Sequence, residues 1–317
     1  GNITITVNGT KYNATIKNGV ATFTINKLLA GKYDITAEYI GDDNNTPVTS
    51  TTLVDGLTVN KVTCYQINVT ANDTKVDLNT TIVVKVPIDA KGNVSIYVDN
   101  VFKGNATIAA GVAELNVTMP YGNHTVNATF TDGKYDFRYA TSTYWVFKHE
   151  APLEIKVDSI LVGDVAYINV TAPSDNVIIE INGKSYTRKS FANNVAYFEV
   201  SGLEYGNKTV VAIYAGSDKY LGNSTTENFT VSKHDSQVNV TATGNAVGSN
   251  ATISVNVTDG ASGYVTINVN GTNYTINLTG SRGSVQIAGL GAGTYYVHAT
   301  YIGDDKYKSS INNTQIS

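Results

Sequence analysis

Apolar and polar residues alternate in short runs along this chain, and the most regular run occurs four times. A period of two puts every second side chain on the same face of a β-strand, so each run predicts a half-buried strand. The four copies are Ile3, Ile5, Val7; Val94, Ile96, Val98; Val177, Ile179, Ile181; and Val265, Ile267, Val269.

Residues that accept positive φ follow each of these runs. Three copies end in Asn-Gly, at Asn8, Asn182 and Asn270, and the fourth ends in Asp99-Asn100. Such pairs close two-residue hairpin turns. A second strand is therefore expected directly after each copy.

A second block also occurs four times in the chain; each copy begins at a glycine and carries apolar residues four, six and eight positions later. Its first copy starts at Gly31 and contains Ile35, Ala37 and Tyr39. Alanine holds the central position in every copy, and in the three later copies we expect it between two closely packed sheets. The other three alanines are Ala128, Ala212 and Ala299.

Short charged junctions separate the copies and divide the chain into four repeats. Residues 62–149, 150–233 and 234–317 each have the length of a seven-stranded sandwich. Residues 1–61 form an incomplete Ig-like repeat that lacks the first two strands. Because strand patterns recur every 8 to 12 residues, we predict an all-β chain of tandem immunoglobulin-like antiparallel β-sandwich repeats.

The block at residues 28–43 (LLAGKYDITAEYIGDD) resembles the bacterial Ig-like repeats of group 3 and related adhesin repeats. Residues 203–218 and 290–305 fit the same pattern, whereas 119–133 departs from it with His124 in place of Tyr. The bias toward Asn, Ile and Tyr is most similar to adhesin-like surface proteins of methanogenic archaea. This resemblance implies an extracellular, cell-anchored array and assigns no activity to any residue.

Composition and charge narrow the possible partners. Charged residues make up 15% of the chain and the net charge is −4. Neither a basic surface for nucleic acid nor an apolar run long enough for membrane insertion is expected. Cys64 is the single cysteine, so an intrachain disulfide is impossible, and its position on a predicted first strand suggests a buried or semi-buried thiol.

About two dozen Asn-x-Ser/Thr sequons occur, several times the number expected by chance. On a strand, Asn and the Ser/Thr two positions later share the solvent face, so a glycan there would leave the core undisturbed. We therefore expect a glycoprotein, and we expect the turn asparagines to carry no glycan. The candidates are Asn68, Asn79, Asn93, Asn116, Asn127, Asn169, Asn239, Asn256 and Asn277.

The sequence offers no catalytic set, no cofactor site and no strong metal site. Paired acids at Asp42-Asp43 and Asp304-Asp305 could bind Ca²⁺, but two adjacent carboxylates are too few ligands, and acids are common in such turns. The histidines are scattered, and no nucleophile elbow is present. We therefore expect the chain not to be an enzyme.

The second repeat is enriched in aromatic residues. Tyr135, Phe137 and Tyr139 are two apart, so they are expected to share one strand face as a sugar-binding or interface surface. Trp145, aligned with Leu57 and Phe229, is expected in the core.

These features favour a structural stalk or fibre segment of a cell-surface adhesin, whose partners are neighbouring repeats or subunits of the same protein. A carbohydrate-binding module for cell-wall or host polysaccharide is the alternative. A filament protomer is another, because residues 1–61 should need completion, either by the same polypeptide or by a strand donated from another subunit.

Overall fold

The computed structural model describes residues 1–244 and 246–317. It contains strands and no helix among these residues, which confirms the all-β prediction. The chain divides into two compact units, Gly1–His149 and Glu150–Ser317, and each contains two of the predicted repeats. The boundaries between repeats remain predictions inside each unit.

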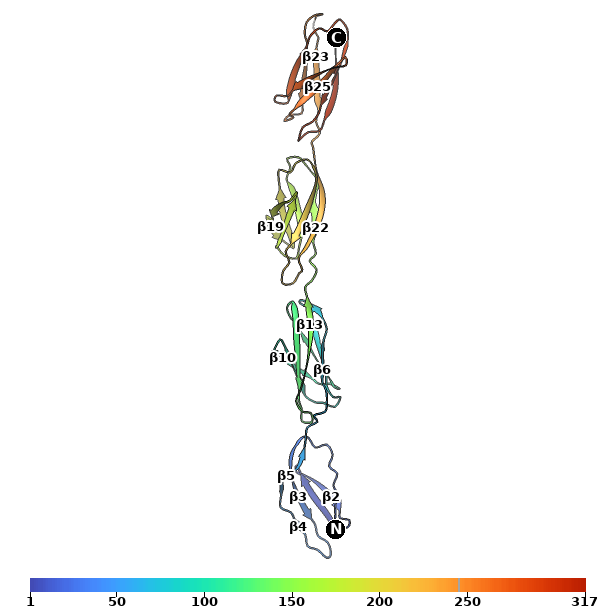
Figure 1. Cartoon of the computed structure of the whole chain (residues 1–317), viewed down its shortest axis with the longest axis vertical. Coiled ribbons are helices and arrows are strands. Elements are labelled where there is room, and N and C mark those ends of the chain that lie inside the picture. Colours follow the sequence, from blue (N-terminus) through green and yellow to red (C-terminus); the bar gives the residue numbers. More distant parts are fainter. Residues whose placement is uncertain (245) are drawn as a thin grey trace. The chain divides into compact units, whose positions relative to one another are not determined.

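Residues 1–61 form a single five-stranded sheet (Figure 1). Both β1 and β5 pair with β3, and β2 pairs with β1 through the predicted hairpin. The strands are β1 (Asn2–Val7), β2 (Thr10–Thr15), β3 (Gly31–Tyr39), β4 (Val48–Thr49) and β5 (Leu53–Val59).

The second repeat has two sheets, ordered β10-β9-β12-β13-β7 and β11-β8-β6. The short β7 runs parallel to β13, and the other pairs are antiparallel. The strands are β6 (Asn68–Ala71), β7 (Thr74–Lys75), β8 (Thr80–Lys85), β9 (Asn93–Val98), β10 (Val101–Thr107), β11 (Val112–Val117), β12 (Gly122–Phe130) and β13 (Arg138–Phe147).

The third repeat repeats this plan, with sheets β15-β22-β21-β17-β18 and β14-β16-β20-β19. Here β15 runs parallel to β22. The strands are β14 (Glu154–Val157), β15 (Ile160–Leu161), β16 (Ala166–Thr171), β17 (Val177–Ile181), β18 (Lys184–Thr187), β19 (Ser190–Ala192), β20 (Val195–Val200), β21 (Gly206–Tyr214) and β22 (Asn223–Ser232).

The fourth repeat has sheets β23-β24-β27 and β26-β25-β28-β29. Its strands are β23 (Val238–Thr243), β24 (Ala251–Val257), β25 (Tyr264–Val269), β26 (Thr272–Asn277), β27 (Arg282–Ile287), β28 (Tyr295–Tyr301) and β29 (Ser310–Ile316).

Sequence accounts for the hairpins and the cores. Asn8, Asn182 and Asn270 all have positive φ, as do Asp99 and Asn100, so each predicted turn forms where expected. The three two-sheet repeats each enclose one hydrophobic cluster. Ala128, Ala212 and Ala299 are fully buried in these clusters, as predicted.

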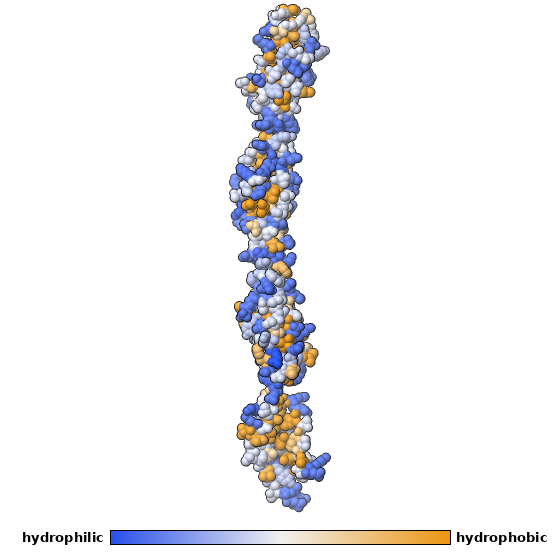
Figure 2. Space-filling model, viewed as in Figure 1, coloured by the Kyte–Doolittle hydropathy of each residue, from blue (hydrophilic) through white to orange (hydrophobic). Residues whose placement is uncertain are grey.

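The first repeat differs because its sheet has no second sheet packed on it. Ile5, Ile35 and Ala37 are only half-buried, whereas their counterparts in the other repeats are fully buried. Figure 2 shows hydrophobic residues gathered on the surface of this N-terminal part. The exposed ones include Val20, Leu29, Val48, Leu53 and Val54.

One segment of the first repeat has the alternating sequence pattern of a strand but forms no strand in the structure. Residues 21–29 belong to no strand, although residues 20–25 match β11 in sequence. In the second repeat, β11 pairs along its whole length with β8. Since the first repeat has no strand corresponding to β8, the segment has the alternating pattern but lacks the ladder that would make it a strand.

Candidate interaction sites at the junction turns and outward sheet faces

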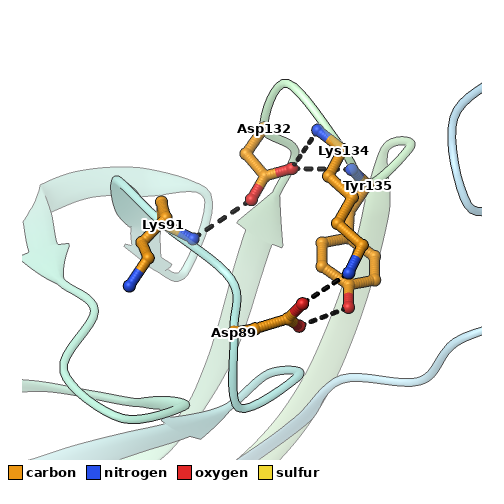
Figure 3. A network of polar contacts seen from close by, with 5 residues as sticks. All are labelled: Asp89, Lys91, Asp132, Lys134 and Tyr135. Atoms are coloured by element: carbon orange, nitrogen blue, oxygen red, sulfur yellow. Dashed lines mark hydrogen bonds and ion pairs between the residues drawn. The ribbon is translucent and has the colours of Figure 1, made fainter. Parts of the chain in front are cut away.

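The turn after β12 is fixed by the carboxylate of Asp132 (Figure 3). One oxygen accepts from the backbone N–H groups of Lys134 at 2.7 Å and Tyr135 at 2.6 Å. The other accepts from the N–H of Lys91 at 3.1 Å, in the loop before β9. Asp132 therefore holds the turn closed and ties it to a neighbouring loop.

Asp89 adds a second link between the same two loops (Figure 3). Its carboxylate accepts from the Tyr135 hydroxyl at 2.6 Å and forms an ion pair with Lys134. The hydrogen bond from Lys134 and that from Tyr135 hold the pKa of Asp89 below its ordinary value. In the second repeat, two acids and one tyrosine thus join the turn after β12 to the loop before β9.

The corresponding turn of the fourth repeat uses Asp304 in the same way. Its carboxylate accepts from the N–H groups of Lys306 at 2.8 Å and Tyr307 at 2.7 Å, and from both the N–H and the hydroxyl of Ser262. Burial alone would raise the pKa of Asp304, but the hydrogen bonds from Ser262, Tyr307 and Lys306 lower it to about 2.

These contacts explain why acids recur in the turns. In the third repeat Ser217 takes the same place, and its hydroxyl accepts from the Tyr220 N–H at 3.2 Å. Asp42 of the first repeat caps its own turn through the Asn44 N–H. Across the described residues, no group of three or more His, Cys, Asp or Glu could hold a metal ion. The paired acids at 42–43 and 304–305 lie in turns that hydrogen bonds to the chain itself hold closed.

In the C-terminal unit, the linker residue His234 contacts both of its neighbouring repeats. Its Nε2 lies 2.9 Å from the carbonyl oxygen of Val162, just after β15. Its backbone N–H donates to the Lys306 carbonyl at 2.8 Å, and its ring lies 5.8 Å from the ring of Tyr307. Lys233 donates to the Asp304 carbonyl. The linker is therefore held on both sides.

In the N-terminal unit, the turn after β12 makes the equivalent contacts. The N–H of Val62 donates to the Lys134 carbonyl at 2.8 Å, and Lys61 Nζ donates to the Thr131 hydroxyl at 3.2 Å. The N–H of Ala30, from the first repeat, donates to the Gly133 carbonyl at 3.1 Å. The junction turn is thus a docking point for the preceding repeat.

His124 stands where the first and fourth repeats have Tyr33 and Tyr295, and its ring contacts the same backbone position as those tyrosine hydroxyls. Its Nε2 lies 2.8 Å from the carbonyl of Pro120, four residues earlier. The hydroxyl of Tyr33 donates to the carbonyl four residues before it at 2.7 Å. His124 Nδ1 also lies 2.7 Å from the Asp99 carboxylate, so the ring contacts an oxygen through each of its two nitrogens.

The structure does not bring the predicted aromatic trio together. Tyr135 is only 6% exposed, and its ring packs against Tyr65 at 4.9 Å. Phe137 and Tyr139 are exposed. Residues 131–137 form the turn and connection before β13, so the period of two that we assumed from Tyr135 to Tyr139 does not hold there. The prediction that Tyr135 shares an exposed face with Phe137 and Tyr139 is therefore wrong.

Trp145 was expected in the core, and this expectation is wrong. It is 43% exposed, while its neighbours Tyr144 and Val146 are buried. The register shows the cause: Tyr144 pairs with His124 as Phe229 pairs with Lys208, so Tyr144 is the counterpart of Phe229. The match of Trp145 with Phe229 is therefore one residue out of register, and a shift of one residue reverses the face on a strand.

Cys64 is exposed, contrary to the expected burial. The first strand of its repeat begins only at Asn68, so Cys64 lies in the connection that precedes the strand. The strand pattern does not extend back to it.

The nine sequon asparagines lie on or beside strands. Seven are exposed: Asn68, Asn79, Asn93, Asn116, Asn239, Asn256 and Asn277. Asn127 and Asn169 are half-buried. Glycosylation stays a prediction for all nine, and the exposed ones offer the most room.

Within residues 1–244 and 246–317 there is no helix with the length and apolar character needed to span a membrane.

Comparison with known proteins found no matching family model and no matching curated protein. Among solved structures, the chain is similar to a tetra-tandem repeat in the extending region of a large adhesion protein, with 16% identity and a TM-score of 0.44 over 100% of this chain and 92% of that one. The Escherichia coli adhesin FdeC is 12% identical with a TM-score of 0.28, over 80% of this chain and 96% of that one. The I9–I11 tandem of titin is 12% identical with a TM-score of 0.25, over 79% and 98%.

Proposed function

We propose that this chain is a stalk segment of an extracellular, cell-surface adhesin, in which sandwich repeats act as spacers for a binding or anchoring element. The observation that carries this proposal is the clamped junction. His234 bonds to Val162 on one side and packs on Tyr307 on the other. A spacer keeps a binding element at a fixed distance only if contacts hold its linkers in place, because free linkers would let the repeats rotate independently.

The repeated junction chemistry supports the same role. Asp132 and Asp304 close the turns against which the preceding linker docks, at equivalent places in two repeats. The resemblance of residues 28–43 to adhesin repeats supports this role and an extracellular location. Sequons on exposed strand faces suit a glycosylated surface protein.

Small-angle X-ray scattering of the whole chain tests the proposal. We expect scattering from stiffly linked repeats, and His234→Ala should broaden the distribution of distances. His298→Ala is the matched control, because His298 is exposed on a strand. Wild-type scattering typical of freely jointed beads would contradict a stalk.

A filament role is a second candidate. Residues 20–25 have the sequence pattern of β11, but the first repeat has no counterpart of β8 with which they could pair. A strand donated by another subunit could complete this sheet through β-augmentation. A synthetic peptide with the sequence of residues 66–87 should bind the whole chain and protect the amides of residues 20–25 from hydrogen exchange. Absence of both effects would contradict this role.

A further inference from the structure

The outward face of the last strand in the second repeat carries exposed aromatic rings that the fold does not require. Trp145 and Phe147 on β13 are 43% and 46% exposed. Their ring centroids lie 6.0 Å apart, with planes within 16° of parallel. Tyr121, which precedes the paired strand β12, is also exposed, and its ring lies 6.5 Å from that of Trp145. We call these three residues the aromatic row.

Other repeats provide an internal control for this face. By strand register, the positions of Trp145 and Phe147 correspond to Thr58 and Asn60 in the first repeat and to Thr230 and Ser232 in the third. All four of those residues are polar. Since the same sheet forms with small polar residues there, packing does not explain the aromatics of the second repeat.

The aromatic row is built on fixed backbone. Tyr144 and Val146, on either side of Trp145, are anchored in the core. The N–H of Trp145 donates to the Asp73 carboxylate at 2.6 Å, in the loop before β7. Rings held in this way lose little freedom when a ligand binds, which favours recognition.

Polar groups surround the rings and include both donors and acceptors. Asn123 lies directly opposite Trp145 in the register of β12 and β13, and Lys75 lies opposite Phe147 in the parallel pair with β7. Both are exposed, and Asp73 supplies an acceptor. Lys148 Nζ lies 5.0 Å from the Tyr121 centroid and so borders the end of the row. Hydroxyl groups both donate and accept, so they suit such a mixed rim.

We propose that the aromatic row is a binding site for a neutral oligosaccharide, whose pyranose rings stack on Trp145 and Phe147 while their hydroxyls bond to the rim. A pyranose ring presents an apolar C–H face and a hydroxyl edge, which matches aromatic faces with polar groups beside them. The row lies on a sheet face, where strand addition cannot occur, since that requires a free edge. Nucleic acid is disfavoured by the net charge of −4. The site is independent of the stalk role.

Trp145 is the only tryptophan in the chain, so its fluorescence reports directly on this site. We would titrate the whole chain with cellohexaose, xylohexaose, mannohexaose and chitohexaose, and probe a glycan array in parallel. At least one neutral oligosaccharide should shift the tryptophan emission in a saturable manner. If none does, and the array shows no binding, the proposal is overturned.

Variants taken from the third repeat separate binding from folding. Trp145→Thr and Phe147→Ser install the residues found at the same register there, so the melting temperature should stay close to wild type. Each should weaken binding on the array by at least about tenfold. Phe137→Ala and Tyr139→Ser, which remove exposed aromatics outside the row, should leave binding unchanged. Binding that survives Trp145→Thr would refute the site.

Two further outcomes would assign the aromatic row to a protein partner and so overturn the proposal. One is concentration-dependent association of the wild-type chain in size exclusion that Trp145→Thr abolishes, which indicates contact between copies. The other is a change in Trp145 emission with a polyproline decamer and none with the sugars, since aromatic surfaces also bind such peptides.

Discussion

The first and second repeats share the same central hairpin and differ in what covers it. In the second repeat, Ile96 and Ala128 are fully buried beneath the sheet formed by β11, β8 and β6. In the first repeat, their counterparts Ile5 and Ala37 are half-buried on a single sheet. Register and turns are thus set within one sheet, whereas burial depends on the second.

Truncation of the central isoleucine should separate the two repeats most strongly. Ile96→Ala removes a buried side chain and leaves a cavity, which should cost about 2–5 kcal/mol. Ile5→Ala should cost less than about 1 kcal/mol, because Ile5 already contacts water. Hydrogen exchange read by mass spectrometry follows each repeat within the whole chain. Equal losses of protection would show that the first repeat has a core of its own.

Enlargement of the central alanine tests the spacing between sheets. Ala212→Leu should overpack the third repeat and cost about 1–3 kcal/mol. Ala37→Leu has no facing sheet to meet and should be nearly neutral. Thermal melts of the two variants measure the difference. A melt of Ala212→Leu that coincides with wild type would contradict the close approach of the sheets.

Removal of the turn carboxylate should weaken the fourth repeat. Asp304→Ala leaves the N–H groups of Ser262, Lys306 and Tyr307 without an acceptor, at a cost of about 2 kcal/mol. Asp305→Ala, at an exposed neighbour, is the control.

This carboxylate also predicts a pH dependence. The folded pKa of Asp304 is about 2, below the unfolded value near 3.9. Its contribution is therefore present above about pH 4 and is lost as the pH falls toward 2. Asp304→Asn should flatten this part of the stability profile, measured by urea unfolding at each pH. An unchanged profile would show that acids other than Asp304 cause the loss of stability at low pH.

The smallest expected effect concerns His124. His124→Phe removes the ring nitrogens that contact the Pro120 carbonyl and the Asp99 carboxylate, and should cost about 1–2 kcal/mol. His124→Tyr should recover part of this loss, since Tyr33 reaches the same carbonyl position in the first repeat. Chemical denaturation compares them. A tyrosine variant no better than phenylalanine would contradict the shared role.

Sequence alone predicted the four repeated strands and the positive-φ turns, because each depends on local spacing. It also predicted the buried alanines of the three repeats that have both sheets. It missed features that depend on pairing between distant segments. Trp145 was placed on the wrong face by a one-residue error that only the pairing of Tyr144 with His124 corrects. The contact of His234 with Val162 joins residues 72 apart, and only the fold brings them together.

The parallel pairing of β7 with β13 has a mechanical consequence. It joins a segment near the start of the second repeat to the segment at its end, through Thr74 with Val146 and Lys75 with Phe147. Tension applied through the two ends of the repeat would pull these strands past one another, so their hydrogen bonds would be loaded in shear and would break together. The third repeat has the same pair in β15 and β22. The sheet of residues 1–61 contains no parallel pair and would extend at lower force.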